Sequence, residues 1–126
     1  YELRAHGDWV LSCAFSPDGN VLATADRGGA ALVWQADTGR DVSALRGHEG
    51  AVQALAFTAD AAVLVTLGED GFACGWDFER GNRTWRTRVG ASPGTALHAL
   101  ADGSLLAAAG EGALLRLSGR DGKAQG

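Results

Sequence analysis

The chain has 126 residues, of which 46% are hydrophobic and 21% charged, so it can fill the core of one globular domain and lacks the composition of a disordered protein. Its net charge is −4 and its eleven Lys and Arg residues are scattered, which argues against nucleic acid as a partner. Two cysteines are too few for a disulfide framework, and no apolar run approaches the length of about 20 residues that crosses a bilayer. We therefore expect a cytoplasmic protein with no metal, no cofactor and no membrane contact.

Short apolar runs separated by Gly and Asp predict β-strands from the start of the chain. The first four strands are expected at residues 10–15, 21–25, 30–34 and 41–45. Asp-Gly pairs are the strongest short hairpin signal, and they occur at Asp18-Gly19, Asp70-Gly71, Asp102-Gly103 and Asp121-Gly122. The chain is therefore predicted to be all-β and to consist of antiparallel hairpins in series.

The sequence repeats with a period of 42 residues. Five residue pairs match at this offset: His6 and His48, Phe15 and Phe57, Asp18 and Asp60, Thr24 and Thr66, and Trp34 and Trp76. A third, more degenerate copy is expected at the same offset without an insertion, which places Asp102 under Asp60, Leu106 under Leu64, Gly110 under Gly68 and Glu111 under Glu69. The period predicts about three repeat units of four strands each.

The segment 96–117 is rich in Ala and Leu, which on intrinsic propensity also fits a helix. Asp102-Gly103 and Gly110 interrupt this segment where the first two copies turn. The register of the repeat is a stronger constraint than propensity, so we predict three strands here.

Motifs at fixed places in the repeat are similar to those of the WD-repeat family. They are Gly47-His48 and Trp76-Asp77 in the second copy, Ala5-His6 and Trp34-Gln35 in the first, and Phe15-Ser16-Pro17-Asp18-Gly19 at a turn. The resemblance covers essentially the whole chain. It implies a β-propeller whose blades are four-stranded antiparallel sheets.

The resemblance also implies where the blades begin and end. Residues 1–4 would be the outer strand of a preceding blade, 5–46 the first blade, 47–89 the second, and 90–126 a degenerate and incomplete third. Three blades are too few for a ring, because propellers typically have four to eight. We therefore expect a fragment of a larger propeller, and exposed blade edges that invite self-association.

Members of this family often carry a hydrogen-bonded set of His, Ser or Thr, Asp and Trp within a blade. The residues implied for this structural set are His48, Thr66, Asp70 and Trp76 in the second copy and His6, Thr24, Asp26 and Trp34 in the first. Asp26 is a substitute there, because Gly28 stands at the usual position of the Asp. The third copy has Gly90 and Ser118 in place of the His and the Trp. A catalytic role for His48 with Asp70 is disfavoured, since no serine or cysteine nucleophile is tied to the pair.

The function implied is that of a non-catalytic scaffold that binds partner proteins or peptides. Family analogy places binding on the face formed by the loop before each first strand and the turn between the second and third strands. The candidate residues on this face are Asp8, Trp9, Arg27, Glu49, Gln53, Glu69 and Glu111. The structural alternative is that Trp9 packs between blades and that the charged residues are only solvated.

Two other functions stay open. Gly81 followed four residues later by Trp85 fits a quinoprotein-like propeller that binds a redox cofactor, although the first copy has Gly39 and Ser43 at these places. A sensor domain attached to a protein kinase or another signalling enzyme would differ only in residues outside this chain.

Overall fold

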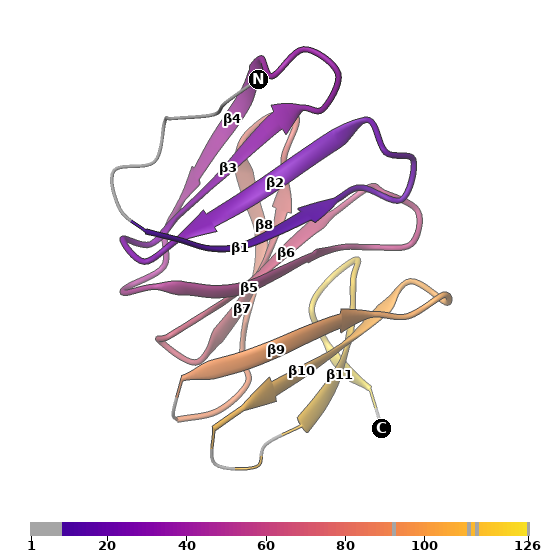
Figure 1. The fold of residues 1–126 in the computed structure, drawn as a ribbon. Helices are drawn as coiled ribbons and strands as arrows, with labels where there is room; N and C mark the ends of the chain where they lie inside the picture. Colours follow the sequence, from indigo (N-terminus) through magenta and orange to yellow (C-terminus); the bar gives the residue numbers. More distant parts are fainter. Residues whose placement is uncertain (1–8, 92, 111, 113, 126) are drawn as a thin grey trace.

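The computed structural model describes residues 9–91, 93–110, 112 and 114–125, and it contains three sheets of four strands (Figure 1). The first sheet, blade 1, consists of β1 (Val10–Phe15), β2 (Val21–Asp26), β3 (Ala30–Gln35) and β4 (Asp41–Arg46). Blade 2 consists of β5 (Val52–Phe57), β6 (Leu64–Gly68), β7 (Phe72–Asp77) and β8 (Asn82–Arg88). Blade 3 consists of β9 (Gly94–Ala99), β10 (Ser104–Ala109), β11 (Leu114–Ser118) and β12 (Ala124–Gln125).

In each blade the strands pair in chain order, and all pairs are antiparallel. The predicted fold class of four-stranded antiparallel propeller blades is therefore confirmed. Residues 94–99, 104–109 and 114–118 are strands, so the helical alternative for this segment is wrong. No helix that could span a membrane occurs among the described residues.

The blades follow one another along an arc, with blade 2 between the other two (Figure 1). Their first strands lie side by side, β1 next to β5 and β5 next to β9. The turn between the second and third strands of each blade therefore lies at one end of the molecule. The turns between the first and second strands lie at the opposite end.

The first hairpin of each blade closes around an aspartate at equivalent positions, Asp18, Asp60 and Asp102. In blade 2, the Thr58 hydroxyl donates to Asp60 Oδ1 at 2.6 Å and the Ala62 amide donates to the same oxygen at 3.0 Å. Hydrogen bonds of this kind, led by the hydroxyl donor, hold the pKa of all three carboxyls below the usual value. An ionised carboxylate thus replaces missing backbone bonds in the turn.

The register of blade 3 differs from the predicted alignment. Phe57 pairs with Leu64 in blade 2, and the equivalent Ala99 pairs with Leu105 in blade 3. Leu105 therefore occupies the place of Leu64, and the prediction of Leu106 there is wrong. From this strand onward the offset between the two blades is 41 residues instead of 42.

A one-residue deletion in the first turn of blade 3 explains this change. The amide of Gly103 donates to Leu100 O as the amide of Ala61 does to Thr58 O, so the offset is still 42 at this point. The next closing bond joins Leu100 to Ser104, where blade 2 has Thr58 and Val63. Blade 3 therefore lacks the residue that corresponds to Ala62.

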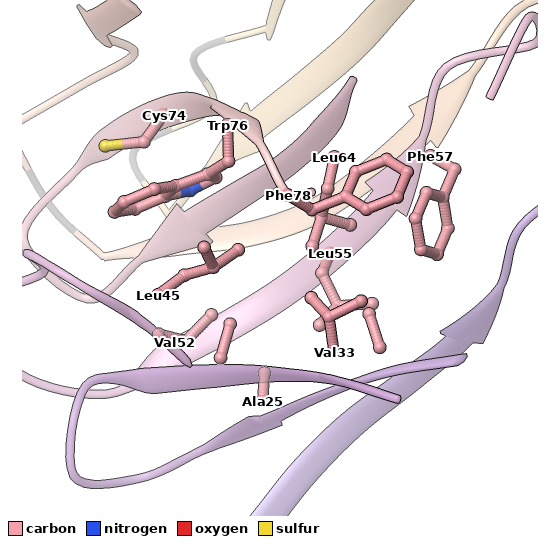
Figure 2. Close-up of a cluster of buried hydrophobic side chains, with 12 residues drawn as sticks. Ala25, Val33, Leu45, Val52, Leu55, Phe57, Leu64, Cys74, Trp76 and Phe78 are labelled. Carbon is pink, nitrogen blue, oxygen red and sulfur yellow. The ribbon is translucent and has the colours of Figure 1, made fainter. Parts of the chain in front are cut away.

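Two apolar clusters hold the blades together. Figure 2 shows the cluster between blades 1 and 2, in which Ala25, Val33 and Leu45 face Val52 and the other buried side chains of blade 2. Phe57 and Phe78 form an edge-to-face pair there, with ring centroids 5.4 Å apart. The cluster between blades 2 and 3 consists of Val65, Leu67, Ala73, Trp85, Val89, Leu105, Ala107, Ala109 and Leu117.

Candidate functional site: a buried polar network and the loop face

The polar network of blade 2 joins two strands to a loop and a turn. The Trp76 indole N–H of β7 donates to Thr66 Oγ1 of β6 at 2.8 Å, and Thr66 Oγ1 lies 2.6 Å from His48 Nε2. On the other side of the imidazole, Nδ1 lies 3.2 and 3.3 Å from the two carboxylate oxygens of Asp70. The structure thus brings together the four residues that the family resemblance implied for this set.

The direction of each hydrogen bond follows from the donors and acceptors present. An ionised Asp70 can only accept, so His48 carries its proton on Nδ1 and donates it. Nε2 then accepts from the Thr66 hydroxyl, whose oxygen accepts the Trp76 N–H. Burial lowers the pKa of His48, and the charge of Asp70 offsets this only in part. The network is therefore complete with a neutral imidazole.

Asp70 also fixes the backbone on both sides of the network. Its Oδ2 accepts the amide N–H of Glu49 at 3.1 Å, and its Oδ1 accepts that of Phe72 at 3.1 Å. Burial raises the pKa of Asp70, but the two amide bonds and His48 outweigh burial and leave the pKa below its usual value. The network therefore holds the loop that carries Glu49.

The order Thr66, His48, Asp70 has the connectivity of a hydrolytic triad, but the site is closed. Thr66 has 0% exposure, and its hydroxyl oxygen already accepts the Trp76 N–H. The side chain of His48 is 2% exposed. A substrate carbonyl cannot reach a hydroxyl in this position, so the geometry does not fit a hydrolytic triad.

Two hydrogen bonds of blade 1 match bonds of this network among the described residues. The Trp34 indole N–H donates to Thr24 Oγ1 at 3.0 Å, as in blade 2. Asp26 Oδ1 accepts the amide N–H of Ala30 at 3.0 Å, and Ala30 is the equivalent of Phe72. Asp26, on β2, thus binds the amide of Ala30. This amide is equivalent to that of Phe72, which Asp70 binds from the turn. The predicted His6 lies outside the described residues.

Blade 3 has an apolar replacement for the network. With the corrected offset, Leu117 occupies the place of Trp76 and Ala107 that of Thr66, and both are fully buried. The prediction of Ser118 at the Trp position is therefore wrong by one residue. Asp102 and Ser104 at the first turn instead bond to Arg116 of β11.

The loop face, defined here as the end with the turns between second and third strands, carries an exposed aromatic residue. Trp9 is 70% exposed, and the Arg27 guanidinium lies 4.5 Å from the centroid of its ring. The amide of Arg27 donates to Trp9 O, as that of Glu69 donates to Ala51 O in the next blade. Trp9 is therefore exposed within this chain, whereas the equivalent Ala51, which has a neighbouring blade beside it, is buried.

The other candidates differ in exposure. Glu49 and Glu69 are exposed and Gln53 is half-buried. Asp8 and Glu111 lie outside the described residues. The amide of Gly110 donates to Pro93 O, which is the equivalent bond to that between Glu69 and Ala51. Gly110, not the predicted Glu111, is therefore the third member of the column that contains Arg27 and Glu69.

The opposite end of the molecule has a hollow that the sequence did not indicate. Its volume is about 800 Å³, and it lies between blades 2 and 3. Five carboxylate residues line it, namely Asp60, Asp77, Glu79, Asp102 and Asp121, together with Arg120. Among the described residues, no group of three or more His, Cys, Asp or Glu side chains has the arrangement that holds a metal ion.

Hydrogen bonds between blades also escaped sequence reasoning. Ser43 Oγ donates to Phe78 O at 2.6 Å, and the Trp85 indole N–H donates to Gly119 O at 3.1 Å. Ser43 and Trp85 are equivalent residues, as are Phe78 and Gly119 at the corrected offset. The Trp85 side chain of the Gly81–Trp85 spacing thus packs between blades 2 and 3.

Comparison with solved structures shows the same fold. The crystal structure of the computationally designed Ika4 protein aligns with a TM-score of 0.86 and 24% identity, over 99% of this chain and 75% of that chain. The crystal structure of the RRP9 WD40 repeats aligns with a TM-score of 0.91 and 14% identity, over 98% of this chain and 39% of that chain.

Sequence comparison finds short matches to longer proteins. WD repeat and SOCS box-containing protein 1 of Mus musculus is 49% identical over 35 residues, which are 28% of this chain and 8% of the relative. An uncharacterised WD repeat-containing protein of Nostoc sp. is 52% identical over 33 residues, 26% of this chain and 2% of the relative. The family profile "WD domain, G-beta repeat" matches residues 1–35 and 39–77, more than half of the chain. The chain therefore belongs to the WD40 repeat family.

Proposed function

We propose that the chain is part of a non-catalytic scaffold that binds a partner protein or peptide through the loop face. WD40 repeats generally mediate protein–protein interaction. The observation that supports this face is Trp9, which is 70% exposed with a guanidinium placed against its ring. Exposed Trp and Arg are the residue types most enriched at the energetic centres of protein interfaces.

The surroundings of Trp9 suggest the chemistry of the partner. Glu49 and Glu69 are exposed on the same face, and the hydrogen bond from the Glu49 amide to Asp70 makes its loop rigid. A rigid surface loses little conformational entropy on binding. A peptide that places an apolar side chain on Trp9 and a neighbouring Lys or Arg near the two carboxylates fits this face.

The test is a random-peptide display library panned against the immobilised chain, followed by fluorescence anisotropy with each recovered peptide. We expect Trp9→Ala to weaken binding at least about tenfold, because an anchoring aromatic typically contributes 2 kcal/mol or more. Glu69→Lys should select against peptides with Lys or Arg. Arg80→Ala is the control, since Arg80 is an exposed residue in the turn after β7, at the end opposite the loop face.

Two results would overturn this proposal. Peptides that bind Trp9→Ala and the unchanged chain equally well would show that the loop face is not the binding surface. Peptides that require Arg80 instead would place binding at the opposite end of the molecule.

A further inference from the structure

The outer strand of blade 2 carries three positive charges on an open surface. The strand β8 is the last in its sheet, so its outer edge has no partner among the described strands. Its three arginines are all exposed, and we define them as the arginine patch: Arg83, Arg86 and Arg88. Blade 2 lies between the other two blades, so the patch is exposed on a blade with both neighbours in place (Figure 1).

Strand pairing places the arginine patch on one side of β8. The partners of the three arginines on β7 are Trp76, Cys74 and Phe72, with a register shift between Gly75 and Trp76. Directly paired residues lie on the same side of a sheet. Cys74 and Trp76 belong to the cluster between blades 1 and 2, whereas Trp85 packs toward blade 3. The patch therefore lies on the side of β8 that faces blade 1.

Phe72 holds two of the arginines together. The guanidinium carbons of Arg86 and Arg88 lie 3.6 and 5.4 Å from the centroid of its ring. Stacking on an aromatic ring attracts each guanidinium and restricts its side chain. Two like charges are thus held on one ring in fixed orientations, so little conformational entropy remains to be lost when they bind a ligand.

The charge of the arginine patch is not neutralised within the described part of the chain. The arginines that form ion pairs there are Arg80, with Asp77, and Arg116, with Asp102. The carboxylate of Asp70 contacts His48 and two backbone amides instead. Guanidinium groups bind carboxylates through two parallel hydrogen bonds, and the patch offers three such groups without a carboxylate partner.

Comparison with blade 1 shows that the blade fold does not require these residues. The blade 1 residues at the places of Phe72 and the three arginines are Ala30, Asp41, Ala44 and Arg46. Blade 1 forms the same four-stranded sheet without the aromatic ring and with one arginine of the three. Charged residues also protect edge strands from pairing with other chains, but that role needs no shared ring. The arrangement in blade 2 is therefore better explained by a ligand.

Carboxylates at both ends of β8 limit the length of that ligand. Asp77 and Glu79 precede the strand, and the exposed Glu69 lies in the turn beside its other end. From Arg83 to Arg88 the strand extends about 17 Å, and alternate residues are about 7 Å apart, as in any extended peptide. A long polyanion such as nucleic acid would meet the flanking carboxylates, whereas a short acidic segment would not.

We propose that the arginine patch binds an extended acidic segment of a partner protein, whose Asp or Glu residues stand at alternate positions. The carboxylates two residues apart in this segment match the guanidinium groups on Phe72. The patch is separate from the loop face, so this proposal does not depend on the function proposed above.

The test is fluorescence anisotropy with a labelled peptide that contains Glu-Thr-Glu-Thr-Glu between Gly-Ser flanks. The matched probe contains Gln-Thr-Gln-Thr-Gln. We expect saturable binding of the Glu peptide with a Kd on the order of 100 µM at about 20 mM salt, and weaker binding at about 150 mM salt. The Gln peptide should not bind.

Variants of the chain locate the binding site. Arg86→Ala should weaken binding about three- to tenfold, and Arg86→Lys should also weaken it, because lysine lacks the planar group that stacks and binds in a bidentate manner. Arg40→Ala removes the same charge from an exposed position before β4 and should leave binding unchanged. Trp9→Ala should also bind normally, which separates this surface from the loop face.

Three results would overturn the proposal. The first is no binding of the Glu peptide at about 1 mM and low salt. The second is an equal loss for Arg40→Ala and Arg86→Ala, which would indicate attraction by net charge alone. The third is tighter binding of a DNA duplex of about 20 base pairs than of the peptide, with loss in Arg86→Ala, which would identify the patch as a nucleic-acid surface.

Discussion

At the scale of single residues, the protonation state of His48 is coupled to folding. Burial lowers its pKa, so protonation costs the folded state more than the unfolded chain. Between the lowered value and the ordinary value of 6.5, the unfolded chain binds more protons than the folded one. Stability should therefore fall as the pH is lowered through and below 6.5. Urea unfolding at pH values from 7.5 to 5 measures this loss.

The variant His48→Gln separates this effect from other titrating groups. It lacks the imidazole, so its stability should depend less on pH over this range, and the gap between the two proteins should narrow toward pH 5. Asp70 contributes only at lower pH, because its pKa is below the usual 3.8. A gap that is constant from pH 7.5 to 5 would contradict the assigned role of His48.

Ala61 is a residue in a backbone conformation that suits glycine. Its φ is 60°, and the equivalent residues Gly19 and Gly103 have φ of 76° and 91°. The left-handed conformation costs an L-residue about 1–2 kcal/mol, partly offset because glycine loses more entropy on folding. We expect Ala61→Gly to stabilise the chain by about 0.5–1 kcal/mol in urea unfolding. The adjacent Ala62→Gly should destabilise it, and equal effects of both would contradict this explanation.

Asp26 should matter for stability although it stands two residues before the expected position. It is 4% exposed and bonds to the amide of Ala30. Asp26→Ala leaves that amide without its acceptor, so we expect a loss of about 1–3 kcal/mol by thermal unfolding. The exposed Asp37→Ala is the control and should change stability by less than about 0.5 kcal/mol. An unchanged melting temperature for Asp26→Ala would rule out its substitute role.

At the scale of strands and blades, the blades differ in what fixes their inner strands. Blade 2 has the full polar network, blade 1 keeps the Trp34–Thr24 bond, and blade 3 has Leu117 and Ala107 at these places. The outer strand of blade 3, β12, has only two residues. We expect amide protection in hydrogen exchange to be lower in blade 3 than in blade 2. Equal protection of blades 2 and 3 would contradict this expectation.

The elements of blades 1 and 2 could be predicted because their signals agree. Alternating apolar residues, turn aspartates and the 42-residue period all indicate the same strand positions. The buried set around His48 could be predicted as well, because a His, a hydroxyl, an Asp and a Trp at family spacing have to meet once the strands pair in order.

The register of blade 3 could not be predicted from the same signals. Residues Leu105 to Ala109 are all apolar, so shifting them by one position changes no polar residue from one face to the other. The deletion beside Gly103 therefore leaves the pattern of apolar and polar residues unchanged. Because of it, Gly110 and Leu117 occupy the places that were predicted for Glu111 and Ser118. The exposure of Trp9 was also undetermined, because it depends on which neighbours cover that side of blade 1.

At the scale of the whole molecule, the described strands form an array in which the main contacts between blades join adjacent blades. Its cohesion therefore depends on two junctions. Trp85 belongs to the junction between blades 2 and 3, where it is 8% exposed. A Cβ added at Gly75 or Gly122 would lie 2.1 or 2.2 Å from the indole ring, so these two glycines make the space that the ring occupies.

The indole of Trp85 thus couples blade 3 to the rest of the chain by packing and by its bond to Gly119 O. We expect Trp85→Ala to cost about 3–5 kcal/mol, and Trp85→Phe, which keeps most of the packing, to lose mainly the hydrogen bond at about 1 kcal/mol. Because the main contacts between blades join adjacent blades, Trp85→Ala should also split unfolding into two transitions, with blade 3 unfolding first. Urea unfolding followed by hydrogen exchange of β10 and β11 distinguishes these outcomes. A single transition with equal loss of protection in all three blades would mean that blade 3 remains coupled through other contacts, such as the bond from Thr87 Oγ1 to Gly122 O.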